Sequence, residues 1–158
     1  MSELAPRFGS NRMLREYLDG FYWPAAVAYR DRLRDGGKLA RVLAEWEATL
    51  GARWHEVHFG SMSVRCERDA WHICVPVYLG EVPAEWGLVE FYADTEQGQP
   101  AECALMSEGV PIAGAIQRYL YHGTLAARRP AEHYTPRVRV ARDGVFVPAE
   151  LSLIAWYR

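Results

Sequence analysis

The chain has 158 residues, a formal net charge of −2, and hydrophobic side chains at half of its positions. This length fits one domain with a helical extension, and the near-neutral charge argues against nucleic-acid binding. No apolar run approaches the roughly 20 residues that cross a bilayer, and no secretory leader is visible, so we expect a cytoplasmic protein that binds no membrane.

The first predicted element is an amphipathic helix within residues 4–26. Its apolar positions follow the spacing of one broad helical stripe: Met13, Leu14, Tyr17, Leu18, Phe21, Tyr22, Ala25 and Ala26. Ser10 is a suitable N-cap, and Pro24 should end or kink the helix near Trp23 because it lacks an N–H. The stripe either packs on the chain's own core or covers a missing neighbour. In the second interpretation Tyr17, Phe21 and Tyr22 form an assembly surface.

The second predicted helix covers residues 38–50, where Leu39, Val42, Leu43, Trp46 and Leu50 share one face. Asp35-Gly36-Gly37 precedes it as a turn and Gly51 follows it. Two helices joined by so short a turn predict an antiparallel helical hairpin.

From Trp54 onward, apolar residues alternate with polar ones, which is typical of β-strands. Strand segments are expected around Gly60 and at residues 71–79, 89–93, 101–106, 112–121, 124–127, 134–140, 145–147 and 151–156. Pro76 would place its strand at a sheet edge or give it a bulge. Arg142-Asp143-Gly144 has the form of a hairpin turn between residues 134–140 and 145–147.

These elements predict a mostly β protein with an N-terminal helical arm, in the α+β class. Two helices would be followed by an antiparallel β-sandwich or barrel of seven to eight strands. The composition changes near Arg53. We therefore expect a helical arm at residues 1–52 and a β domain at residues 53–158.

Side chains that could carry chemistry do not form a recognisable catalytic or metal motif. His55 and His58 would point to opposite faces of a strand, so they could not share a metal ion. The acidic residues Glu81, Glu85 and Glu90 are expected on a charged loop and sheet face. The three cysteines, which form no CxxC pair, are expected to be free and mostly buried.

Aromatic side chains are the better candidates for ligand binding. Exposed rings can stack on sugar faces, although most Trp and Tyr side chains serve packing. Trp86 lies in a predicted loop and Tyr92 on the polar side of a predicted strand. We therefore interpret Trp86 and Tyr92 as a candidate sugar platform, and the alternative function is a carbohydrate-binding module for α-glucans.

Three stretches resemble the C-terminal region of bacterial short-type α-glucan phosphorylases, which follows the catalytic lobes of those glycosyltransferases. The first stretch is similar to the last helix of their catalytic part and reads PRFGSNRMLREYLDGFYWPAA, with Gly9 in place of an expected serine. VPVYLGEVPAEWGLVEFYAD resembles the following strand, loop and strand. YTPRVRV and VPAELSLIAW resemble the family's ending. Together these stretches cover about half of the chain.

The resemblance implies a non-catalytic, β-rich domain of a glycogen or maltodextrin phosphorylase-like enzyme. Such a domain would brace the catalytic lobes or mediate assembly, by self-association or with the parent enzyme, and Met1 would be an internal methionine of that longer chain. The family's pyridoxal phosphate forms a Schiff base with a lysine, and the only lysine here, Lys38, follows a solvated turn. We therefore expect the cofactor only in the parent enzyme, and no catalytic, cofactor-binding or metal residues in this segment.

Overall fold

A computed structural model describes residues 10–96, 98–107, 109–114, 117–147 and 149–158. The chain divides into two compact units, Met1–Glu47 and Ala48–Arg158. Each unit is described by itself below.

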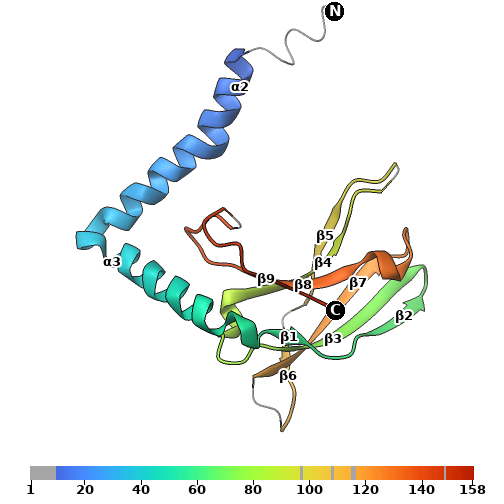
Figure 1. The fold of residues 1–158 in the computed structure, drawn as a ribbon. Helices are drawn as coiled ribbons and strands as arrows, with labels where there is room; N and C mark the ends of the chain where they lie inside the picture. The colour runs from blue at the N-terminus through green and yellow to red at the C-terminus, as the bar shows by residue number, and fades with distance from the viewer. Residues whose placement is uncertain (1–9, 97, 108, 115–116, 148) are drawn as a thin grey trace, which may run out of the picture. The chain divides into compact units, whose positions relative to one another are not determined.

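The first unit is helical, and its helix does not stop at Pro24. It begins with α2 (Ser10–Tyr17), widens into the π-helical turn η1 (Leu18–Tyr22) and continues as α3 (Trp23–Arg53), the helix that also enters the second unit (Figure 1). Of the two predicted effects of Pro24, an end or a kink near Trp23, the end is therefore wrong, and the departure from α-helical geometry takes the form of this π-helical turn. In η1 the N–H of Trp23 bonds to the carbonyl of Leu18. The wider turn just before Pro24 accommodates a residue that lacks an N–H and crowds the preceding turn.

The predicted turn between the two helical segments is confirmed. Arg34 has an extended backbone, and Asp35, Gly36 and Gly37 all have positive φ angles, which glycine adopts readily. Arg41 donates a hydrogen bond to the carbonyl of Gly36 across this turn. The predicted hairpin packing is absent among the described residues. Leu33, Leu39 and Val42 stay exposed on both sides of the turn, so the segments bury no shared apolar seam.

The large apolar side chains of the stripe on the first helical segment are all exposed. Phe21 and Tyr22 are 67% and 65% exposed, and Tyr17 lies 5.8 Å from Phe21 between ring centroids. Met13, Leu14 and Leu18 of the stripe are exposed as well, and so is the neighbouring Trp23. A methyl group at Gly20 would meet nothing within 4 Å, so no close backbone contact explains this glycine in the described structure.

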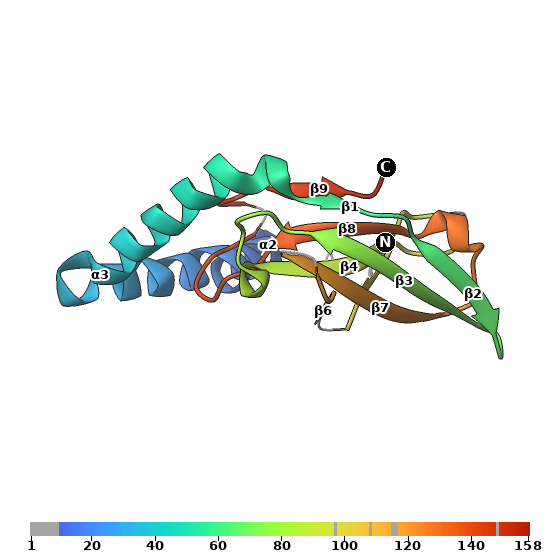
Figure 2. The ribbon, with the colours of Figure 1, turned by 90° about the horizontal axis from the view of Figure 1, so that it is seen from below.

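The second unit contains two antiparallel sheets. Sheet A has the order β1-β3-β7-β6, with β2 also paired to β3, and sheet B has the order β5-β4-β8-β9 (Figures 1 and 2). The strands are β1 (His58–Phe59), β2 (Ser63–Glu67), β3 (Ala70–Tyr78), β4 (Gly87–Ala93), β5 (Glu102–Leu105), β6 (Val110–Pro111), β7 (Arg118–Ala126), β8 (Thr135–Val140) and β9 (Ile154–Trp156). The described strands thus number nine rather than seven or eight, and they form a sandwich of two sheets rather than a closed barrel.

The strand that holds Pro76 lies inside sheet A rather than at its edge. β3 pairs with β7 on one side and with β1 and β2 on the other. The predicted strand around Gly60 is split into β1 and β2, and Gly60 donates its N–H to the carbonyl of Pro76 at 2.8 Å. The break in the neighbouring strand lies opposite the proline because Pro76 cannot donate a ladder hydrogen bond there.

The core lies between the two sheets and comes from the alternating residues of four central strands. Its fully buried members include Ile73, Val75, Val77, Val89, Phe91, Val138 and Val140. Gly123 of β7 faces Phe91 of β4 across this core. A Cβ atom at position 123 would overlap Cε2 of the Phe91 ring and lie 3.1 Å from Cζ. The glycine therefore makes room for a buried aromatic ring.

Two predictions about the second half of the β unit are wrong. Residues 118–126 form one continuous strand, β7, instead of separate strands that end at Tyr121 and begin at Thr124. Residues 145–147 form no strand, although the Asp143-Gly144 turn does form and Val145 donates to the carbonyl of Arg142. The open side of β8 pairs instead with β9, in the register Val138 opposite Ala155. A local turn signal cannot reveal that a later segment occupies this edge.

Candidate functional site

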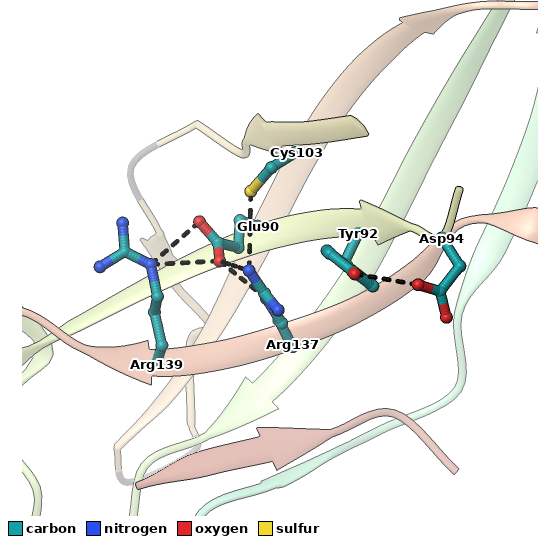
Figure 3. Close-up of polar contacts among 6 residues, drawn as sticks. All are labelled: Glu90, Tyr92, Asp94, Cys103, Arg137 and Arg139. Atoms are coloured by element: carbon teal, nitrogen blue, oxygen red, sulfur yellow. Dashed lines mark hydrogen bonds and ion pairs between the residues drawn. The ribbon is translucent and has the colours of Figure 1, made fainter. Parts of the chain in front are cut away.

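The outer face of sheet B carries a cluster of polar and aromatic side chains that contact one another. Along β4, Val89, Phe91 and Ala93 point into the core, so Glu90 and Tyr92 point outward. Cys103 of β5 and Arg137 and Arg139 of β8 lie beside them on the same face (Figure 3). Trp156 of β9 lies opposite Arg137 on that face. We call Glu90, Tyr92, Cys103, Arg137, Arg139 and Trp156 the outer cluster.

Glu90 is the centre of the outer cluster and is only 1% exposed. Its Oε1 atom accepts from Arg137 Nε at 2.7 Å and lies 2.6 Å from Arg137 Nη2. Arg139 Nε donates to both carboxylate oxygens at 3.1 Å. The sequence predicted a charged sheet face here, but the carboxylate is covered by two guanidinium groups. A buried charge is tolerated because it is paired and hydrogen-bonded.

The surroundings of Glu90 determine its protonation state. Burial alone would raise the pKa of the carboxyl group. Hydrogen bonds with Cys103, Arg137 and Arg139 outweigh burial and hold the pKa of Glu90 below its ordinary value. Glu90 is therefore ionised at neutral pH and unsuited to act as a general acid. Partial desolvation and the adjacent Glu90 carboxylate raise the pKa of the Cys103 thiol, although this residue is exposed, so the cysteine is a poor nucleophile.

The lowered pKa of Glu90 predicts how the stability of the β unit depends on pH. The unfolded chain binds the proton at a higher pH than the folded chain does. The stabilisation should therefore be complete above about pH 5 and lost progressively as the pH falls below about 4. Urea unfolding from pH 7 to pH 3 measures this loss. Glu90→Gln should flatten the acid limb, and an unchanged limb in that variant would contradict the assignment.

Arg137 lies between two aromatic rings of the same face. Its guanidinium carbon is 4.3 Å from the centroid of Tyr92 and 5.2 Å from that of Trp156. The two rings meet edge to face, with centroids 5.6 Å apart. The hydroxyl of Tyr92 donates to Asp94 at 3.0 Å, and this bond raises the pKa of Tyr92. The arginine and the two rings thus fix one another in place.

The structure does not bring the two residues of the predicted sugar platform together. Trp86 ends a 3₁₀ turn just before β4, and Tyr92 lies six residues further along, roughly 20 Å away by the rise of a strand. Both are half-buried, and Arg142 lies 5.9 Å from the ring of Trp86. The neighbour of Tyr92 is Trp156 instead. Sequence reasoning missed the two arginines of β8, although their alternation with Val138 and Val140 marks them as outward-facing.

The other sequence candidates lie apart from the outer cluster. His55 is exposed in the 3₁₀ turn η2 (Trp54–Glu56), and His58 is exposed on β1. Glu81 and Glu85 are exposed, and Lys38 is exposed after the helical turn. The cysteines are free, as predicted, but Cys66 and Cys103 are exposed rather than buried. Within the described ranges, no group of three or more His, Cys, Asp or Glu side chains could hold a metal ion.

Comparisons relate the chain to part of one kind of enzyme. It is 29% identical to a maltodextrin phosphorylase of Thermococcus litoralis over 162 aligned positions. The match covers 99% of this chain but 19% of the relative's length, and it does not establish which region is shared. No family model and no solved structure match the sequence. Among the described helices, none is long and apolar enough to cross a membrane.

Proposed function

We propose that this chain is a non-catalytic β-rich domain of an α-glucan phosphorylase-like glycosyltransferase. It would brace the catalytic lobes or provide an assembly surface. The observation that carries the proposal is the match along nearly all of this chain to a small part of a maltodextrin phosphorylase. The ordered resemblance of the chain's two ends to the C-terminal region of such enzymes gives further support. Pyridoxal phosphate would be held by the catalytic part and not by this segment.

The exposed helical stripe is the surface that we propose for this contact. It includes Tyr17, Phe21 and Tyr22, three aromatic side chains that are at least half exposed in the structure. Aromatic anchors of this kind contribute much of the binding energy in protein interfaces. The proposed occupant is the catalytic part of the phosphorylase-like enzyme. When that part is absent, the same stripe would drive self-association.

Enzyme assays test the proposal that this chain is non-catalytic and that the catalytic part of the enzyme carries the activity. The isolated chain should release no glucose 1-phosphate from maltoheptaose and orthophosphate. A chimera in which this chain replaces the matching segment of the Thermococcus litoralis enzyme should release it. Phosphorolysis by the isolated chain would overturn the non-catalytic assignment.

The stripe itself is tested by Phe21→Ser combined with Tyr22→Ser. Light scattering should show a self-associating wild-type chain, and the double variant should weaken that association by about tenfold or more. Arg15→Ser combined with Asp19→Ser is the matched control, because it changes two exposed residues of the same helical segment without altering the net charge. A wild-type chain that is monomeric at high concentration would contradict the assembly role.

The alternative proposal is a carbohydrate-binding module that uses Trp86 and Tyr92. An arginine lies over each of these rings, Arg137 over Tyr92 and Arg142 over Trp86. This arrangement supports a sugar platform less strongly than two uncovered rings would. Leucine substitution at each ring, followed by titration with maltoheptaose, tests it directly.

A further inference from the structure

A hollow of about 560 Å³ lies where the edges of the two sheets meet, at β1 of sheet A and β9 of sheet B. We call it the seam hollow. The side chains that matter for its chemistry are Trp54, His55, His58, Phe59, Trp156 and Arg158. Figure 2 shows β1 and β9 side by side. The volume falls within the range of small-molecule sites in proteins, and the lining combines aromatic rings with a few polar groups, as such sites do.

The aromatic lining is held in place by a second layer of side chains. Trp156 is 39% exposed and is supported by Arg137 and Tyr92 of the outer cluster. Phe59 meets the ring of Tyr157 edge to face, with centroids 5.8 Å apart. Rings fixed in this way lose little freedom when a ligand stacks on them, so less binding energy is spent on ordering.

The polar lining is also oriented. His58 Nδ1 lies 2.7 Å from the carbonyl oxygen of Glu56, and because a carbonyl can only accept, this nitrogen carries the proton. The other ring nitrogen, Nε2, is then an acceptor when the imidazole is neutral. The ring stacks on Tyr78 at 4.5 Å with an interplanar angle of 6°.

We propose that the seam hollow binds a neutral oligosaccharide. Sugar rings present apolar C–H faces that stack on Trp156 and Phe59, and hydroxyl groups that can bond to His58 and Arg158. A neutral ligand is favoured over an anion because the lining has three aromatic rings and only one permanently charged side chain, Arg158. Trp86 does not line the seam hollow, so this site differs from the Trp86 and Tyr92 platform, and the proposal does not depend on the helical stripe.

Titration of the full chain with maltoheptaose and with cellohexaose tests the proposal. The choice of maltoheptaose rests on the proposed function, and cellohexaose is a second oligosaccharide. Amide chemical shifts should move for residues 54–59 and 154–158, with saturation below about 10 mM. Trp156→Leu and His58→Ala should each weaken binding by about tenfold. Phe146→Leu is the matched control, because Phe146 is 40% exposed in the same unit but lies outside the hollow.

Each other outcome overturns the proposal. If these resonances shift with neither oligosaccharide, the seam hollow is not a sugar site. The phosphorolysis and light-scattering experiments test the proposed function independently of that result. Loss of binding in Trp86→Leu but not in Trp156→Leu would move the site to the Trp86 platform. Orthophosphate shifting the same resonances without any effect of sugar would make it an anion site. Circular dichroism shows whether each variant is folded. His58 is exposed, so we expect His58→Ala to weaken binding without unfolding the chain.

Discussion

Gly123→Ala is expected to lower the free energy of unfolding of the β unit by about 3 kcal/mol, the upper part of the usual range for overpacked cores. The added methyl would overlap the ring of Phe91, which is itself only 1% exposed. Neither partner can retreat cheaply, because both strands are central and paired on both sides. Urea unfolding followed by circular dichroism measures the change.

A double-mutant cycle shows whether the cost comes from this contact. Phe91→Leu removes part of the ring, so the Gly123→Ala change should cost much less in that background. Gly51→Ala is the control, because a methyl there meets nothing within 4 Å and alanine is the better helix former. If Gly123→Ala were as stable as the wild type, the close packing of β7 on β4 would be wrong.

Glu90→Gln is the second large change and is expected to cost about 3 kcal/mol of stability. The substitution leaves Arg137 and Arg139 beside each other without a negative charge, although their side chains are 17% and 31% exposed and can turn partly toward water. Thermal or urea unfolding at pH 7 measures the effect. Replacing all three residues by apolar ones, Glu90→Leu with Arg137→Met and Arg139→Met, should recover most of the lost stability.

Glu81→Gln is the matched control for this experiment. Glu81 also pairs with an arginine, at 2.7 Å from Arg53, but its side chain is 65% exposed. A surface ion pair of this kind contributes at most about 1 kcal/mol, so the control should change stability little. Equal losses in the two variants would show that the outer cluster is not a buried ion pair.

Local patterns in the sequence account for much of the helical unit. The turn at Asp35–Gly37 was predictable because two glycines and an aspartate can adopt positive φ angles. The continuation of the helix through Pro24 was not predictable. It depends on a π-helical turn that reduces the clash of the proline ring with the preceding turn, and such a turn depends on the whole backbone around it. The exposure of Phe21 and Tyr22 was one of two interpretations left open by the stripe.

The candidate site was only partly predictable. Alternation along residues 88–93 placed Glu90 and Tyr92 on the outer side of their strand, and this was confirmed. The partners of Glu90 lie 47 and 49 residues away on β8, and no local pattern indicates which strand lies beside which. For the same reason the sequence linked Tyr92 with Trp86, whereas the fold places it against Trp156.

Three features of this protein follow from the amino-acid sequence alone: the change from helix to strand, the inward and outward alternation of most strands, and the positions of the glycine turns. These depend on backbone preferences and on side-chain periodicity within a few residues. The pairing of β3 with β7 and of β4 with β8, the place of β9 instead of residues 145–147 beside β8, and the burial of Glu90 became evident from the folded chain and not before. Those features depend on contacts between residues distant in the chain, where the free energy of packing outweighs local preference.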